Sequence, residues 1–169
     1  MSEPSTNPMR QALRALTHGV YVLSVAADDV DDFLVVSLAM QCSVEPPRIA
    51  FALSTNARIL TSIREARGGA FSILGERDAI VARRYGAPGG VRNIPKNPER
   101  TSAGHPIPPE LSFWLEFSIV QEIAAGDHIL FVADVTGAGK SLPPDTSGDD
   151  QSTSFTPLTL ARSGFPYAG

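Results

Sequence analysis

The segment that decides the fold of this chain is residues 111–138, LSFWLEFSIVQEIAAGDHILFVADVTGA. Two apolar runs, 113–120 and 129–135, flank a shorter segment in which Ala124-Ala125-Gly126-Asp127 predicts a turn. Apolar and polar residues alternate in the first run, which is typical of a strand with one buried face. We therefore predict a β-hairpin. Its inward face should carry Phe113, Leu115, Phe117, Ile119, Ile129, Phe131 and Val135.

His128 stands where this turn leads into the returning strand. A titratable side chain at the rim of a sheet can face a ligand, whereas one in the middle of a strand would have to be buried and hydrogen-bonded. Taken alone, such a histidine is more often a residue of a surface turn.

The length, cysteine content and net charge limit the class of protein. At 169 residues the chain is expected to form one domain, 1–169. Its single cysteine excludes an internal disulfide and a cysteine metal cluster, and it fits a reducing compartment, so we expect a cytoplasmic protein. A net charge of −4 without a basic stripe argues against nucleic-acid binding. The first residues lack a continuous apolar core and no apolar run approaches the length of a membrane span, so we expect a soluble protein that is neither exported nor inserted.

Along the chain, apolar strands recur without a regular strand-helix-strand alternation. This order predicts a mainly β fold, an antiparallel barrel with helices packed outside it. Residues 1–6 are expected to be disordered, 28–32 to form an acidic turn, and 87–109 and 140–155 to be long loops. The expected strands are 20–25, 33–41, 49–53, 70–74 and 157–161, and the expected helices are 8–17, 57–66 and 77–85.

A first candidate site follows the strand at 49–53. Hydroxyl and amide side chains precede the expected helix, and an arginine lies close behind them. Unpaired N–H groups at a helix N-terminus, together with such donors, suit a phosphate group. The same residues can also simply cap the helix. The candidates are Ser54, Thr55, Asn56, Ala57 and Arg58.

The chain resembles a known family in the order of several motifs. These are the strand Trp114-Leu115-Glu116, the turn that ends Gly126-Asp127-His128, and the later pairs Pro157-Leu158 and Gly164-Phe165. Their order and spacing over most of the chain are similar to those of the flavin reductase-like family of FMN-binding split barrels. The resemblance implies an antiparallel, Greek-key-like split β-barrel with peripheral helices.

The resemblance also implies a function and a site. The expected activity is hydride transfer from NADH or NADPH to FMN or FAD, in a homodimer that can supply a partner monooxygenase. Residues 54–58 would hold the flavin phosphate, His128 would orient the nicotinamide, and Arg84 at the end of a helix would contact the flavin. The ring and ribityl chain would lie along Ser37, Met40, Gln41, Cys42 and Ser43.

Three positions depart from the family pattern, namely Phe33, Leu34 and Met40. They leave two alternatives open: a flavin-binding electron carrier without NAD(P)H turnover, and a barrel without flavin that serves as an interaction subunit. By itself, the stretch 37–43 is also an ordinary buried strand, and basic residues are favourable at any helix C-terminus. No catalytic triad, metal-ligand spacing or glycine-rich nucleotide loop is present.

Overall fold

The structure of the protein is a computed structural model. The structure describes residues 7–28, 30–86, 90–92, 94–109, 111, 113–140 and 155–165. The expectations for residues 1–6 and for most of 140–155 therefore lie outside the described residues.

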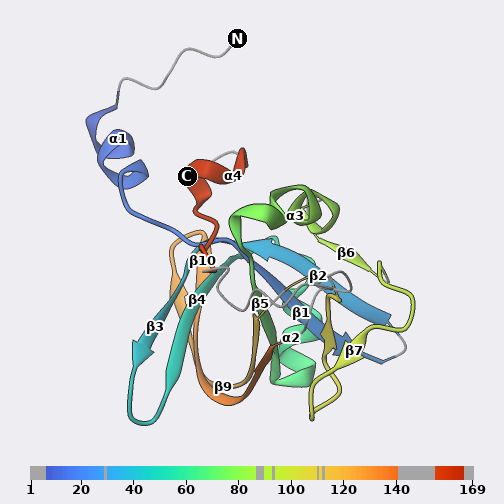
Figure 1. Ribbon diagram of the computed structural model, residues 1–169. Coiled ribbons are helices and arrows are strands. Elements are labelled where there is room, and N and C mark those ends of the chain that lie inside the picture. Colours follow the sequence, from blue (N-terminus) through green and yellow to red (C-terminus); the bar gives the residue numbers. More distant parts are fainter. Residues whose placement is uncertain are drawn as a thin grey trace.

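Eight strands form one curled sheet, in the order β3-β4-β10-β9-β5-β1-β2-β6 (Figure 1). Every pair of neighbouring strands in it is antiparallel, as predicted. The strands are β1 (Tyr21–Ala27), β2 (Val30–Val36), β3 (Ala39–Ser43), β4 (Arg48–Ser54), β5 (Gly68–Ile73), β6 (Val91–Arg92), β9 (Phe113–Ala125) and β10 (His128–Lys140). A separate pair joins β7 (Glu99–Arg100) and β8 (Pro106–Ile107).

Short helices surround this sheet. They are α1 (Pro8–Arg14), α2 (Leu60–Ala66), the 3₁₀ turn η1 (Glu76–Asp78), α3 (Ala79–Tyr85) and α4 (Leu160–Ser163). Asn7 caps α1 by accepting the Met9 N–H, as a residue before Pro8 is expected to do. No residue of α1 is buried, and Figure 1 shows this helix standing away from the sheet.

The predicted hairpin is confirmed and is longer than expected. β9 and β10 pair from Phe113 with Lys140 to Ala125 with His128, so the strand continues through residues 121–125 that the sequence assigned to the connection. Leu115, Phe117 and Ile119 do contribute to the core, as their alternation predicted. Residues 120–125 are exposed, including the apolar side chains of Val120 and Ile123, so the regular alternation of the first part of the strand does not continue here.

The core has two parts. Inside the curl of the sheet, Phe51 lies at the centre of an aromatic group, with ring centroids 4.9 Å from Phe71 and 5.2 Å from Phe117 and Phe131. Helix α2 packs against this cluster through Ile59, Leu60 and Ile63. A second cluster lies beneath α3, where Tyr85 packs against Phe33. The two helices thus cover different clusters.

Two predictions about strands were wrong. The expected strand 33–41 is divided into β2 and β3, because the chain leaves the ladder at Ser37 and Leu38. The acidic stretch 28–32 is not a solvated turn: Asp28 lies in the turn, but Asp31 and Asp32 belong to β2 and are buried. Arginines distant in sequence make this burial possible, and the local pattern contained no sign of them.

The helix boundaries also differ. Helix α2 begins at Leu60 instead of residue 57, and it ends on Arg67 in the left-handed conformation (φ 51°) instead of on a glycine. Gly68 and Gly69 start β5, where a Cβ would lie 2.7 Å from the Phe117 carbonyl oxygen and 2.9 Å from the Ser24 carbonyl oxygen, respectively. The expected last strand is reduced to isolated bridges at Pro157 and Thr159 that lead into α4.

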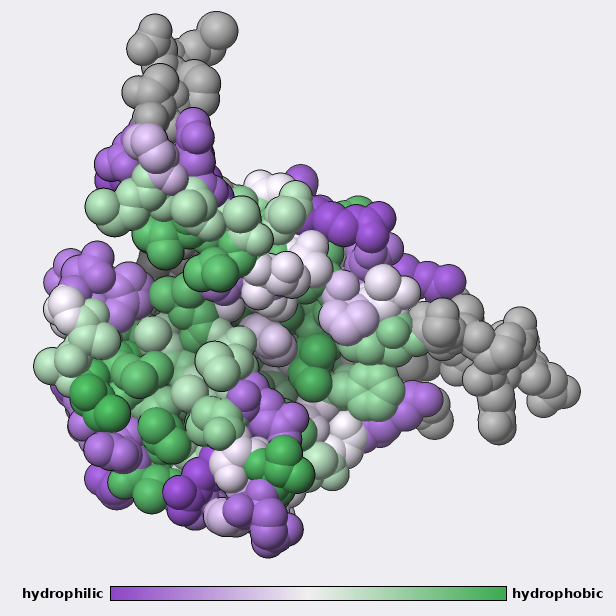
Figure 2. Space-filling model, turned by 90° about the vertical axis from the view of Figure 1, so that its left-hand side faces the viewer, coloured by the Kyte–Doolittle hydropathy of each residue, from purple (hydrophilic) through white to green (hydrophobic). Residues whose placement is uncertain are grey.

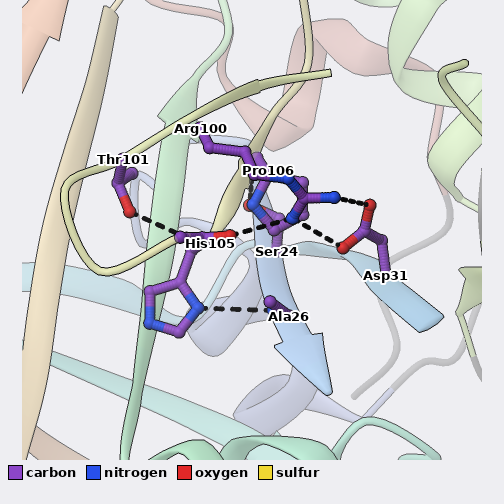
Figure 3. A network of polar contacts seen from close by, with 8 residues as sticks. Ser24, Ala26, Asp31, Arg100, Thr101, His105 and Pro106 are labelled. Carbon is purple, nitrogen blue, oxygen red and sulfur yellow. Dashed lines mark hydrogen bonds and ion pairs between the residues drawn. The ribbon is translucent and has the colours of Figure 1, made fainter. Parts of the chain in front are cut away.

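The expected loop 87–109 is not structureless where it is described. Arg100 donates two hydrogen bonds to the buried Asp31, at 3.0 and 2.9 Å (Figure 3). The buried His105 ring accepts the Ala26 N–H at Nδ1, 3.3 Å away, and Ser24 donates to the Pro106 carbonyl oxygen. These contacts fasten the loop across β1 and β2.

Burial lowers the pKa of His105 below its usual 6.5, and the nearby Glu116 opposes this shift only in part. A histidine that is neutral in the folded protein but protonated when unfolded costs stability as the pH falls. The contribution of the neutral His105 to the free energy of unfolding is therefore complete above about pH 6.5 and is lost as the pH falls below that value.

We predict that the free energy of unfolding decreases between about pH 7 and pH 5 and that His105→Asn reduces this decrease, because asparagine offers an acceptor without titrating. Urea unfolding at several pH values measures both proteins. The same pH dependence in the variant and the parent would contradict this role.

Candidate functional site

Two of the predicted sites lie side by side. Antiparallel pairing of β4 with β10 sets Ser54 opposite His128, and the Thr55 N–H donates to the Asp127 carbonyl oxygen at 2.9 Å. The Thr55 hydroxyl reaches the same oxygen at 3.2 Å. The loop after β4 and the turn before β10 are therefore joined directly, although more than 70 residues separate them in sequence.

His128 lies at the start of β10 with its side chain 23% exposed. Its Nδ1 is 2.8 Å from the Asp127 carboxylate, and this hydrogen bond, with the charge of the ring, lowers the pKa of Asp127. The contact occupies one ring nitrogen and fixes the orientation of the ring. The second nitrogen can therefore serve a ligand without loss of that contact.

The loop at 54–58 is built differently from the prediction. Because α2 begins at Leu60, no helix N-terminus lies next to Ser54, and the argument from unpaired helix N–H groups does not apply. Ser54 instead closes a local turn: its hydroxyl accepts the Asn56 N–H at 3.3 Å, and its carbonyl oxygen accepts the Ala57 N–H at 2.9 Å. The exposed polar groups that remain for a ligand are the side chains of Thr55, Asn56 and Arg58.

The predicted residues at 37–43 extend along the edge of the sheet instead of converging on one point. The Ala52 N–H donates to the Leu38 carbonyl oxygen, which brings Ser37 to the same end of β4 as Ser54. From there β3 runs antiparallel to β4 until Ser43 pairs with Arg48, about 20 Å away at 3.3 Å per residue. Met40, Gln41 and Cys42 are exposed along this edge.

Arg84 is not brought to this loop. It belongs to α3, whose Tyr85 packs on Phe33, whereas α2 contacts the neighbouring residue Asp32. Adjacent residues of a strand point to opposite faces, so β2 lies between the two helices.

A polar cluster that no sequence pattern indicated lies next to the loop. Asp32 is fully buried and binds Arg58 from the loop, Arg92 from β6 and the Ser62 hydroxyl from α2. The four residues come from four segments and follow no motif, so only the fold could bring them together.

Other features of the described part of the chain do not add to this site. A cavity of about 570 Å³ between the end of α1 and α4 includes none of the residues predicted to bind flavin. Within the described ranges, no three His, Cys, Asp or Glu side chains are grouped to hold a metal ion. No helix in those ranges is both long and apolar enough to cross a membrane.

Comparison with known proteins relates this geometry to a family. Residues 13–169 match the family described as flavin reductase like domain. Over 127 residues the chain is 29% identical to the stachydrine N-demethylase reductase subunit of Rhizobium meliloti (strain 1021), covering 75% of this chain and 55% of that protein. The chain thus spans just over half the length of that relative.

Two further comparisons agree. The reductase component of the 4-nitrophenol 4-monooxygenase/4-nitrocatechol 2-monooxygenase of Rhodococcus opacus is 26% identical over 129 residues, 76% of this chain and 69% of that protein. The flavin reductase of styrene monooxygenase from Pseudomonas putida S12 has a similar structure, with a TM-score of 0.67 and 23% identity over 78% of this chain and 87% of that one. The latter similarity confirms the predicted split-barrel fold.

Proposed function

Because the chain belongs to the flavin reductase like domain family, we propose that it transfers hydride from NADH or NADPH to FMN or FAD. One observation carries the proposal beyond family membership. The exposed donors at 54–58 and the imidazole of His128 adjoin at the same end of β4 and β10. Hydride transfer needs two planar rings held in contact, and it needs no nucleophile or metal from the protein.

The residues present suit such a ligand. When bound, the flavin supplies the hydride-accepting ring. The protein supplies Thr55, Asn56 and Arg58 as donors for the phosphate. It also supplies the edge strand β3, where the side chains of Met40 and Cys42 are exposed and the flavin ring can lie beside the backbone. His128, held by Asp127, orients the carboxamide of the nicotinamide by a hydrogen bond. Bound rings would exclude water from this end of the barrel.

We further propose that a monooxygenase uses the reduced flavin. This rests on the two relatives, which are the reductase subunit of a demethylase and the reductase component of a monooxygenase. An exposed, unpaired thiol at Cys42 also suits a protein of the reducing cytoplasm.

We propose that the working form is a homodimer, formed through the side of the sheet that carries β3. Figure 2 looks onto that side of the molecule and shows apolar residues gathered on it. Large exposed apolar side chains come from this edge, including Met40 (64% exposed) and Val44 (79% exposed). Patches of this kind mark interfaces more often than free surfaces.

The alternative of a flavin-binding electron carrier rests on Phe33, Leu34 and Met40, where the chain departs from the family pattern. Phe33 is buried in the core beneath α3, and this position suits a structural role for the substitution. An interaction subunit that has lost flavin is the third possibility.

We predict that anaerobic addition of NADH or NADPH to the protein with FMN or FAD bleaches the visible absorbance of the flavin. Stopped-flow absorbance measures the rate, and the same mixture without protein is the control. If neither donor bleaches a flavin that the protein binds, the protein is an electron carrier; if no flavin binds, it is an interaction subunit.

The dimer predicts a solution mass of twice the 18.0 kDa of one chain. Val44→Asp should shift the protein towards monomer, because a carboxylate would be buried at the interface without a partner. Light scattering after size exclusion measures the mass. Ile80→Asp on α3, at a site 81% exposed, is the matched control and should leave the mass unchanged.

His128→Ala should raise the KM for the nicotinamide about tenfold, the cost of one hydrogen bond to the bound ligand, and should leave flavin affinity nearly unchanged. Steady-state kinetics and flavin fluorescence titration separate the two effects. Asp127→Asn should give a smaller rise, since it weakens only the orientation of the ring. Unaltered kinetics in His128→Ala would exclude the assigned role.

A further inference from the structure

The cluster around Asp32 has an unusual charge balance. Asp32 is the only carboxylate that its two arginines share in the described contacts: Arg92 Nε lies 2.7 Å and Arg58 Nη1 2.8 Å from the same oxygen, Oδ1. Arg92 Nη2 also donates to Oδ2 at 3.1 Å, and Ser62 donates its hydroxyl to Oδ2. One negative charge thus faces two positive charges.

The burial of these groups is unequal. The side chain of Asp32 is 1% exposed, whereas those of Arg58 and Arg92 are 36% and 45% exposed. A buried carboxylate is stable only when it is paired. Here the buried Asp32 binds both guanidinium groups and so holds them close to each other. Both guanidinium side chains are therefore partly accessible to solvent, and among the described contacts the cluster carries an excess of one positive charge.

The backbone brings the two arginines to this place. Strand β6 pairs with β2 so that Arg92 lies opposite Asp32. Gly90, just before β6, has φ +87°, and a Cβ there would lie 2.5 Å from the Phe33 carbonyl oxygen and 3.5 Å from Arg58 Nη2. This glycine permits the close approach of β6 to β2 and to Arg58.

A guanidinium carries five N–H donors in a plane. Asp32 accepts two N–H groups from Arg92 and one N–H group from Arg58. The remaining N–H groups of the two arginines make no contact with Asp32. Two partly exposed guanidinium groups that meet at one carboxylate oxygen suit the oxygens of a phosphate, because each guanidinium can donate two parallel N–H groups to it.

We propose that Arg58 and Arg92, drawn together by the buried Asp32, bind a phosphate group of one of the two nucleotides, and that Arg92 is a binding residue no sequence motif indicated. The inference rests on the proposed flavin reductase function and deepens it. Arg58 belongs to the loop at 54–58, so the flavin phosphate is the first source; a phosphate of the nicotinamide nucleotide is the second.

The test compares ligands that differ by the phosphate. Fluorescence titration gives the Kd of FMN and of riboflavin for the parent, Arg58→Gln and Arg92→Gln. Each substitution should weaken FMN about tenfold and leave riboflavin within about twofold, because a charge-assisted hydrogen bond is lost only with the phosphate. Arg92→Lys, which retains the charge, should recover part of the affinity.

Arg100→Gln is the matched control, since Arg100 is also paired with an aspartate of β2, but in the loop over the other face of that strand. It should not alter the ratio of the two Kd values. Equal weakening of FMN and riboflavin by Arg92→Gln, or no weakening of any nucleotide, would overturn the proposal. An unchanged FMN affinity with a raised KM for NADH assigns the phosphate to the nicotinamide nucleotide.

A separate measurement distinguishes this proposal from the function on which it rests. Inorganic pyrophosphate should raise the thermal midpoint of the parent and of Arg100→Gln but not of Arg92→Gln. If the parent binds neither flavin yet gives this result, the reductase function fails and the phosphate site stands. The phosphate site alone fails if the protein reduces flavin but the variants do not differ from the parent in FMN affinity or in the thermal shift with pyrophosphate.

Discussion

The double pairing of β10 is the constraint on which the rest of the structure depends. This strand forms hydrogen-bonded ladders with β9 on one edge and β4 on the other, so it fixes the position of both. The ladder with β4 brings the loop after Ser54 against the turn before His128. It also carries Phe131 onto Phe51, with the two rings stacked at a centroid distance of 5.2 Å. The register of this one ladder thus determines both the core and the candidate site. A slip of one residue would turn the side chains of both to the opposite face of the sheet.

Buried charge is the second organising feature, and it acts on the side of the sheet away from β10. Asp31 and Asp32 are consecutive in β2 and point to opposite faces, where Asp31 binds Arg100 and Asp32 binds Arg58 and Arg92. Asp31 holds the loop at 94–109 through Arg100, and Asp32 joins β6 and α2. The cost of burying each carboxylate is offset only when these segments are in place. The loop is therefore ordered by charge pairing as well as by apolar contact.

The family relationship and the geometry support each other at different levels. Membership accounts for the split barrel, and the structure places the polar groups that we propose as nucleotide contacts. The loop at 54–58 lacks the helix N-terminus that the sequence suggested, so the phosphate binding that we propose there depends on side chains, Arg58 above all. Residues 40–43 lie along an exposed edge, where a ligand or a second copy of the chain can be accommodated.

The sequence by itself determined the features that repeat along the chain or lie close together in it. The alternation of residues 113–119 predicted which face of β9 is buried, and the turn at Gly126-Asp127 predicted the position of His128. The tertiary structure decided where the expected strand 33–41 is interrupted, where α2 begins, and that Asp32 meets Arg58, Ser62 and Arg92. Periodicity records whether a residue faces the core, because burial selects its polarity. It carries no information about which distant charge will neutralise a buried one, since that pairing exists only after the strands have taken their register.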